Sequence, residues 1–447
     1  MSVKSNLVLA GLLGATALAP GMARADSNAT PDFWTGLWSP ARTNLLGDIG
    51  GLRPWLGSFG ATFSLNEVSE GLANATGGIR SGAVYDGLTT AAFQLDTGKA
   101  FGLNGGTFNV SALQYHGRGL SSNYLLSLDT SSGIEAERAT RLWELWYDQQ
   151  FFGGTADVKL GQQSVDQEFI TSQNSATFMN TMFGWPALPS YDLNGGGPAY
   201  PLSSPGVRLR VVPNGAVTVL AGVFDDDPGG GAFGTDSQAL DASGARFSLR
   251  DGTLAMTEIQ YAVNQPAVGD TTSSQTSTGL PGTYKLGFWY DSGTFPNYET
   301  GTEVRGDYSI YAVADQMIWR PDPQSTQSLN FFTRLMGSPR SDRNFVDLAI
   351  NAGFTLKAPF KGRDSDTAGL AYGYTRVGAD AAVASIPTRS AEQYAELTYQ
   401  YQAAGWWVLQ PDFQYIFNPG GGVENPDTLT TKIRDEAVFA LRTTVTF

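Results

Sequence analysis

The sequence predicts an all-β fold, a 16-stranded antiparallel transmembrane β-barrel with a long constriction loop folded into its interior. Only 16% of the 447 residues are charged, against roughly 25% in a typical soluble domain, while 54 residues are glycine and 12% are aromatic. After residue 25 no apolar run approaches the ~20 residues that a membrane-spanning helix requires. Segments of about ten residues instead alternate apolar and polar side chains, as strands do when one face meets lipid and the other meets water.

The first 25 residues read as a secretory signal peptide. Lys4 precedes an apolar run over 7–19, and Ala23-Arg24-Ala25 has the form of a cleavage site, so the mature chain is expected to begin at Asp26. An uncleaved anchoring helix is the alternative. Cleavage removes two basic residues and shifts the net charge from −14 to −16. An exported chain without cysteine is common in a periplasm or an outer membrane, and the barrel pattern favours the outer membrane of a Gram-negative cell.

Composition excludes several other classes of protein. The absence of cysteine rules out disulfide scaffolds and cysteine zinc sites, and the single histidine, His116, leaves little scope for hydrolase triads. The acidity disfavours nucleic acid as a partner, because phosphate contacts need an excess of Lys and Arg. A hydrophobic content of 41% is enough to exclude a disordered chain.

The C-terminal segment shows the strand pattern most clearly. Phe439 and Leu441 share one parity, and Glu436 and Arg442 share the other, so one face is apolar and the other polar. The same alternation predicts sixteen strands at 58–65, 82–95, 107–117, 142–150, 155–163, 206–212, 216–224, 254–263, 283–290, 308–319, 327–336, 344–355, 367–376, 390–402, 405–416 and 436–447. These strands make 58–447 the barrel domain, and 26–57 is expected to be a periplasmic segment or short helix.

The connections between these strands fall into two classes. Short turns such as 152–154 and 403–404 follow even-numbered strands, whereas long links such as 118–141, 164–205 and 291–307 follow odd-numbered ones. Short periplasmic turns and long extracellular loops are typical of outer-membrane barrels, and a soluble sandwich has no reason for this asymmetry. The long link at 264–282 departs from the rule, which indicates either an unusual turn or a miscounted strand.

Several segments resemble one family. The stretch Asn44–Arg53 resembles the N-terminal signature LLGDWGGLR of the carbohydrate-selective porins of the OprB type, with Ile49 at the usual Trp. Further similar segments are Gly105–Val110, Gln114–Ser121, Leu142–Gln149, Asn180–Pro186, Pro281–Gly287 and Ala314–Gln316. The resemblance covers nearly the whole mature chain. It implies a 16-stranded outer-membrane channel that passes sugars, glucose in the well-studied members.

The longest link, 164–205, is the expected constriction loop. It carries Trp185, Tyr191 and Asn194, and sugars present C–H faces that stack on aromatic rings and hydroxyls that bind polar groups. These three side chains are therefore candidates for the substrate path. The alternative is that they only pack the folded loop against the wall.

Arg208 and Arg210 are candidates for the wall of the channel. They lie two residues apart, so both face the same way, and an Arg in the lipid would cost about 2–4 kcal/mol at the midplane. We expect both to face the lumen, with Val207 and Leu209 toward lipid. A guanidinium there can bind sugar hydroxyls, set an anion preference, or simply pair with carboxylates.

Glu144 and Asp148 share a parity that we expect to face the lumen, opposite Trp143 and Leu145, and they could pair with these arginines. His116 and Arg118 follow at the end of the third strand. His116 is interpreted mainly as a polar wall residue rather than a pH sensor.

Arg80, in the first outer loop, completes the candidates for the substrate path. Asp225-Asp226-Asp227 resembles a fragment of a calcium loop but lacks the spacing of an EF-hand, so no cofactor is expected and a structural Ca²⁺ is a minor alternative.

The sequence thus predicts a passive channel for sugars that contacts outer-membrane lipid. A general or anion-preferring porin, a barrel enzyme dependent on His116, and a soluble exported β-protein are the alternatives. Monomer and homotrimer both remain open.

Overall fold

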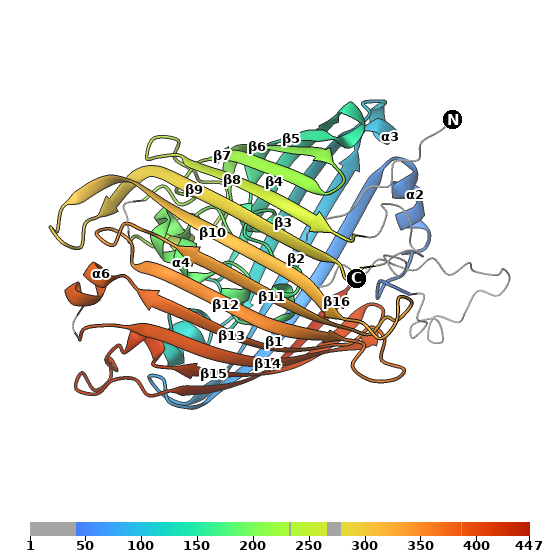
Figure 1. Cartoon of the computed structure of the whole chain (residues 1–447). Coiled ribbons are helices and arrows are strands. Elements are labelled where there is room, and N and C mark those ends of the chain that lie inside the picture. The colour runs from blue at the N-terminus through green and yellow to red at the C-terminus, as the bar shows by residue number, and fades with distance from the viewer. Residues whose placement is uncertain (1–41, 232–233, 266–278, 386) are drawn as a thin grey trace.

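A computed structural model describes residues 42–231, 234–265, 279–385 and 387–447. Sixteen antiparallel strands form one closed barrel in which each strand pairs with its neighbours in sequence and β1 pairs with β16 (Figure 1). The strands are β1 Ala61–Thr76, β2 Gly82–Asp96, β3 Gly106–Gly117, β4 Ala139–Phe151, β5 Ala156–Gln163, β6 Ser204–Asn214, β7 Val217–Phe224, β8 Leu254–Val263, β9 Gly282–Pro296, β10 Glu303–Trp319, β11 Ser328–Gly337, β12 Val346–Lys357, β13 Thr367–Val377, β14 Ala391–Ala404, β15 Trp407–Phe417 and β16 Glu436–Thr446. The predicted number and order of strands are confirmed.

The helices of the described residues are short. They are α2 Leu52–Ser58, α3 Thr97–Phe101, α4 Ala187–Asp192, α5 Ser237–Leu240 and α6 Ala379–Ala384, with 3-10 or π turns at η1 Ser121–Leu125, η2 Phe152–Gly154, η3 Val165–Gln167, η4 Ser175–Thr177, η5 Thr181–Phe183, η6 Asn194–Gly196 and η8 Pro419–Gly421. No helix in these residues is long and apolar enough to cross a membrane.

Helix α2 lies at the periplasmic end of the barrel, beside the C-terminus (Figure 1). Arg53 donates to the carbonyls of Gly47 at 2.9 Å and Phe63 at 2.9 Å, and Leu45 N donates to Thr446 O at 2.7 Å. The predicted signal peptide lies outside the described residues.

Two expected boundaries were wrong. Strand β1 was predicted at 58–65 but runs to Thr76, because polar and small residues such as Glu67 and Gly71 on its outer face obscure the alternation. The link 291–307 was predicted to be long, but β9 and β10 extend toward each other and leave only 297–302. Most of the link after β8, residues 266–278, lies outside the described residues, and β8 pairs directly with β9 through Glu258↔Gly287.

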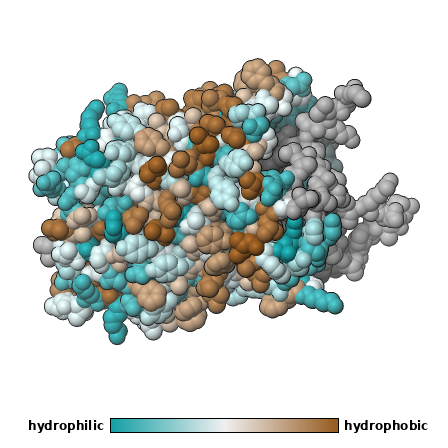
Figure 2. Space-filling view, viewed as in Figure 1, coloured by the Kyte–Doolittle hydropathy of each residue, from teal (hydrophilic) through white to brown (hydrophobic). Residues whose placement is uncertain are grey.

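The outer face is apolar over most of the barrel. Leu286 on β9, Ile310 on β10 and Leu370 on β13 are all more than half exposed, as a lipid-facing wall requires. Figure 2 shows hydrophobic side chains gathered across the middle of one face, between more hydrophilic ends. The buried apolar residues instead lie inside the barrel, where loops fill part of the lumen.

Candidate functional site

The link between β5 and β6, residues 164–203, folds into the barrel as predicted for a constriction loop. Its apolar side chains pack on the inner wall: the Phe183 ring lies 4.7 Å from that of Phe178, 5.8 Å from that of Phe332 on β11 and 5.6 Å from that of Tyr394 on β14, between ring centroids. The loop therefore covers the inner face of β11–β14 and narrows the lumen.

Carboxylates of the wall hold the backbone of this loop. Glu258 accepts a hydrogen bond from Ile170 N at 3.0 Å, Asp315 accepts one from Asn174 N at 3.1 Å, and Glu396 accepts one from Asn180 N at 3.1 Å. A loop buried inside a barrel must find partners for its N–H groups, and carboxylates bind them more strongly than neutral acceptors do. These contacts fix the position of the loop on β8, β10 and β14.

Arg334 on β11 holds the same loop by donating hydrogen bonds to its carbonyl groups. Its guanidinium is fully buried and donates to Gly184 O at 2.8 Å, to Ile170 O at 3.2 Å and to Met182 O. Its Nε donates to Asn351 Oδ1 at 3.0 Å, which holds the planar fork in place. One arginine thus joins two stretches of the loop, at Ile170 and at Met182–Gly184, to the wall.

The predicted inward orientation of Arg208 and Arg210 agrees with the structure. Val207 and Leu209, which alternate with them, are 45% and 43% exposed on the outer face. The two arginines do not pair with Glu144 and Asp148, however. Both pair with Asp157 on the neighbouring strand β5, and Arg208 also contacts Glu168 of the loop.

The residues that pair with Arg208 and Glu168 could have been recognised in the sequence by their spacing. Asp157 and Lys159 lie two apart in β5, so both face the lumen, and Lys159 pairs with Glu168 while lying 4.7 Å from the centre of the Trp146 ring. Glu144 instead accepts a hydrogen bond from Ser164 N at 3.2 Å, at the start of the loop.

One orientation on β4 was predicted wrongly. Trp143 was expected to face lipid, but a bulge in the pairing of β3 with β4 turns it inward, where it is fully buried against Leu113 and Tyr115. The extra residue of a β-bulge shifts the alternation locally, and the sequence gives no sign of it. Tyr200 of the constriction loop lies against Trp143 at 6.5 Å between ring centroids.

A second link, residues 118–138, also enters the lumen. Glu135 accepts hydrogen bonds from Ser121 N at 2.9 Å and Ser121 Oγ at 2.7 Å. Burial raises the pKa of Glu135 from its ordinary value of 4.5 to about 6, and the hydrogen bonds from Ser121 oppose that rise. Arg442 on β16 pairs with Glu70 and donates to Ser132 Oγ at 3.2 Å, so this link is joined to the wall as well.

The inner face of β1–β4 carries polar atoms that have no hydrogen-bond partner in the described part of the chain. They are Glu70 Oε2, Asp86 Oδ1, Thr90 Oγ1, Asn109 Nδ2 and Asp148 Oδ1, and they follow one another from the extracellular toward the periplasmic end. Buried polar atoms are rarely left without partners unless water or a ligand serves them. Except for Asp148, none of these residues stood out in the sequence.

A polar cavity of about 300 Å³ lies between the constriction loop and the periplasmic half of β7–β10. Its lining includes Thr171 and Gln173 from the loop, and Gln260, Lys285 and Asp315 from the wall. Lys285 Nζ donates to Thr171 Oγ1 at 2.7 Å. The cavity therefore presents both donors and acceptors to the periplasmic half of the lumen.

The three predicted loop residues are buried and bonded to protein. Trp185 Nε1 donates to Gly196 O at 2.9 Å, Tyr191 Oη donates to Leu128 O at 3.1 Å, and Asn194 Nδ2 donates to Asp226 Oδ2 at 2.9 Å. These contacts stabilise the fold of the loop, as the alternative interpretation expects.

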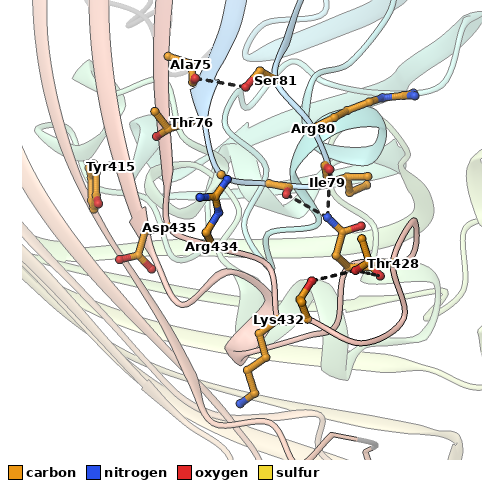
Figure 3. Close-up of a pocket in the computed structure, with 14 residues that line it drawn as sticks. Ala75, Thr76, Ile79, Arg80, Ser81, Tyr415, Thr428, Lys432, Arg434 and Asp435 are labelled. Atoms are coloured by element: carbon orange, nitrogen blue, oxygen red, sulfur yellow. Dashed lines mark hydrogen bonds between the residues drawn. The ribbon is translucent and has the colours of Figure 1, made fainter.

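The other candidates are dispersed. Arg80 lies at the extracellular end, in the link between β1 and β2, beside a cavity of about 950 Å³ that Lys432 and Arg434 also line. Figure 3 shows the Arg80 side chain directed away from Arg434, and its guanidinium carbon lies 5.2 Å from the centre of the Tyr124 ring. Arg118 is exposed at the start of the second link.

His116 does not face the lumen. Tyr115, on the opposite parity of β3, is buried inside, and a Cβ added at outward-facing Gly87 would lie 2.5 Å from His116 Nε2. The histidine therefore lies on the outer face of the barrel, which corrects the expectation that it is part of the inner wall.

The aspartate run 225–227 is bonded internally. Asp227 accepts from Gly229 N at 3.0 Å and from Gly231 N at 2.8 Å. In the described ranges no group of three or more His, Asp or Glu side chains has an arrangement suited to a metal ion.

A closed 16-stranded barrel with an apolar outer face and a loop docked across its interior defines the class of outer-membrane porins. The model of the family described as "Carbohydrate-selective porin, OprB family" matches residues 80–447. The chain therefore belongs to the OprB family, a family of carbohydrate channels of the Gram-negative outer membrane.

Individual relatives agree with this assignment. The chain is 26% identical to Porin B of Pseudomonas aeruginosa over 90% of its own length and 92% of that protein. It is 23% identical to a putative porin QuiX of Acinetobacter baylyi, over 93% of this chain and 96% of that protein. The fold matches a high-pH structure of Pseudomonas putida OprB with a TM-score of 0.78, at 22% identity, over 92% of this chain and 99% of that one.

Proposed function

We propose that this channel admits monosaccharides of the glucose type by facilitated diffusion, without cofactor or chemical reaction. The observation that carries the proposal is the 300 Å³ cavity below the constriction loop, because its volume is at the lower end of small-ligand sites. Its hydroxyl, amide, ammonium and carboxylate groups can exchange hydrogen bonds with sugar hydroxyls from several directions. Contacts of this kind are individually weak, so the solute can leave as well as enter.

Liposome swelling with purified protein tests the proposal. Glucose should enter faster than a disaccharide and faster than an uncharged polyol of similar size that lacks a ring. Equal rates for all solutes of one size would refute selectivity and leave a general diffusion porin.

An anion-preferring porin is the second candidate, because Lys159, Arg208 and Arg210 lie together on β5 and β6. Asp157 and Glu168 pair with these three cations, so little positive charge is left to attract anions. Reversal potentials across a KCl gradient should accordingly be small compared with those of a strongly anion-selective pore.

An enzyme that depends on His116 is not favoured by the geometry. Ser69 lies on the same outer face, but its hydroxyl bonds to Glu67 at 3.1 Å and to Tyr85 Oη at 3.1 Å. A serine nucleophile needs a base within hydrogen-bond reach of its own oxygen, and no such contact joins Ser69 to His116 among the described hydrogen bonds. Esterase assays on His116→Ala and the unaltered protein should both give background rates.

A further inference from the structure

The cavity of about 950 Å³ beside Arg80 lies on the outer side of the barrel, at its extracellular end (Figure 3). Its lining includes Tyr415 on β15, and the next residue, Ile416, is buried inside the barrel, so Tyr415 points outward. Tyr415 pairs with Ala437 of β16, which pairs with Thr76 of β1, and directly opposite residues share one face of a sheet. The floor of the cavity is therefore the lipid side of the barrel, at the level where strands end and headgroups begin.

Two links that are far apart in sequence form the walls of this cavity. One joins β1 to β2 and the other joins β15 to β16. Asn425 Nδ2 of the second link donates to Ile79 O of the first at 3.0 Å, and Gly78 N donates to Arg434 O at 3.2 Å. These hydrogen bonds hold the two links together, so the shape of the cavity is part of the fold.

The cavity is positively charged in a chain whose net charge is −14. Arg80, Lys432 and Arg434 line it, against the single carboxylate of Asp435, which accepts a hydrogen bond from Asn418 N at 2.9 Å. Arg80 is directed away from Arg434 (Figure 3). Lys432 and Arg434 are exposed, and in the described part of the chain no ion pair joins either of them to a carboxylate. These two cations therefore remain to bind an anion from outside the chain.

An exposed apolar surface lies directly below the cavity. Phe439 on β16 is two residues, or about 7 Å, nearer the periplasmic end than Ala437, and it is 53% exposed. Its ring lies 4.9 Å from that of Phe413 on β15, between centroids, and Leu441 continues the same face. A positively charged hollow above such a surface matches an amphiphile with an anionic headgroup and acyl chains. A free anion or a sugar would use the upper part alone.

We propose that this cavity binds the phosphate-bearing headgroup of a lipid in the outer leaflet, whose acyl chains cover Phe439 below. The outer leaflet of a Gram-negative outer membrane is built of a phosphorylated glycolipid. The Arg434 guanidinium matches phosphate oxygens in a bidentate geometry, and the Lys432 ammonium adds a point charge. The hydroxyls of Thr428 and Thr431 can bind the headgroup's sugar. The inference is independent of which solute crosses the lumen.

Lipid binding to the full-length protein tests the proposal. The protein in mild detergent is titrated with lipid A that carries two phosphates, and native mass spectrometry measures the fraction of chains with one lipid bound. Lys432→Gln combined with Arg434→Gln should raise the dissociation constant roughly tenfold, as expected for the loss of two cations at a lipid surface. Lys432→Arg combined with Arg434→Lys keeps both charges and should retain most of the affinity.

A matched double variant separates the site from the total charge. Lys99 and Lys361 are exposed at the periplasmic end of the barrel, on α3 and in the link between β12 and β13. Lys99→Gln combined with Lys361→Gln removes the same charge and should leave the dissociation constant unchanged. An equal loss of affinity in the two glutamine double variants would overturn the proposal, because binding would then follow net charge.

Two further ligands separate a lipid site from a site for any anion. Lipid A without phosphates should bind the unaltered protein roughly tenfold more weakly, since it offers nothing to Lys432 and Arg434. Inorganic phosphate in millimolar excess should not displace the phosphorylated lipid, because it makes no contact with the apolar surface below. Equal affinity for the phosphate-free lipid would show that the acyl chains alone are recognised, and displacement by inorganic phosphate would assign the cavity to a free anion. Either result refutes the proposal.

Discussion

Arg208 Nε lies 2.7 Å from Glu168 Oε2, and this ion pair joins the barrel wall to the constriction loop. Arg208 also pairs with Asp157 beneath the loop, so one buried guanidinium serves a carboxylate from each structure. The ion pair complements Arg334, which binds the loop's carbonyl groups from strand β11. Charged groups of the wall, as well as apolar packing, therefore hold the loop that narrows the channel.

Replacing Arg208 should widen the channel. Arg208→Ala leaves Asp157 and Glu168 short of a buried partner, a loss of about 3–5 kcal/mol for a broken buried pair. We expect the early part of the loop to detach and single-channel conductance to rise at least twofold. Arg210→Ala is the control, because Arg210 is 39% exposed and its ion pair in the described part of the chain is with Asp157 of the wall, not with the loop. A conductance that changes equally in both variants would argue against the tie to the loop.

Replacing Arg334 should weaken the loop on its other side. Arg334→Met preserves bulk but leaves the carbonyls of Ile170, Met182 and Gly184 without this donor, at about 1–3 kcal/mol for each group left unsatisfied. Limited proteolysis should then cut within 164–203 in the folded barrel, whereas the unaltered loop resists. If the variant resists proteolysis as well as the unaltered protein does, the wall carboxylates are enough to hold the loop without Arg334.

The architecture was predictable because a barrel repeats one simple rule. Alternation along strands such as β16 and the two-sided lengths of the links give the strand count without any knowledge of long-range contacts. The rule fails where polar residues lie on the outer face: strand β1 was predicted too short because Glu67 and Ser69 lie on its outer face. Parity also fails at a bulge, which is why Trp143 was placed on the wrong side.

The site was less predictable than the fold, for a related reason. Parity identified the lumen-facing side of Arg208, but it cannot say which of several inward carboxylates lies closest. That choice depends on register between strands and on where the loop descends, both of which are long-range properties. The orientation of His116 was predicted wrongly for a different reason. It is a lone polar residue near a strand end, and its neighbours in sequence do not determine whether it faces the lumen or the outside of the barrel.

Two substitutions on strand β8 can test whether sugar binds in the cavity below the loop. Gln260→Leu removes a donor and an acceptor from the cavity lining and should reduce glucose affinity, measured by current block, about three- to tenfold. Thr257→Val, three residues earlier on the outer face of β8, should leave the affinity unchanged. Equal effects, or none, would move the sugar path away from this cavity.

The link 118–138 should be held more tightly in acid than at neutral pH. Burial raises the pKa of Glu135 to about 6 from an ordinary value of 4.5, so the docked link binds a proton more tightly than the released link does. The added stability is complete below pH 4.5 and is lost as the pH rises through about 6. Nearby Glu70 acts in the same direction, because a second negative charge further disfavours ionisation.

Hydrogen exchange at the Ser121 amide, which donates to Glu135, measures this effect. Its protection factor should fall roughly tenfold between pH 4.5 and pH 7, since each unit of pKa difference corresponds to about tenfold in the opening equilibrium. Glu135→Gln keeps the acceptor but cannot titrate, so its protection should be flat over the same range. A fall of equal size in Glu135→Gln would assign the pH dependence to other groups, such as Asp129, whose pKa burial raises to about 7.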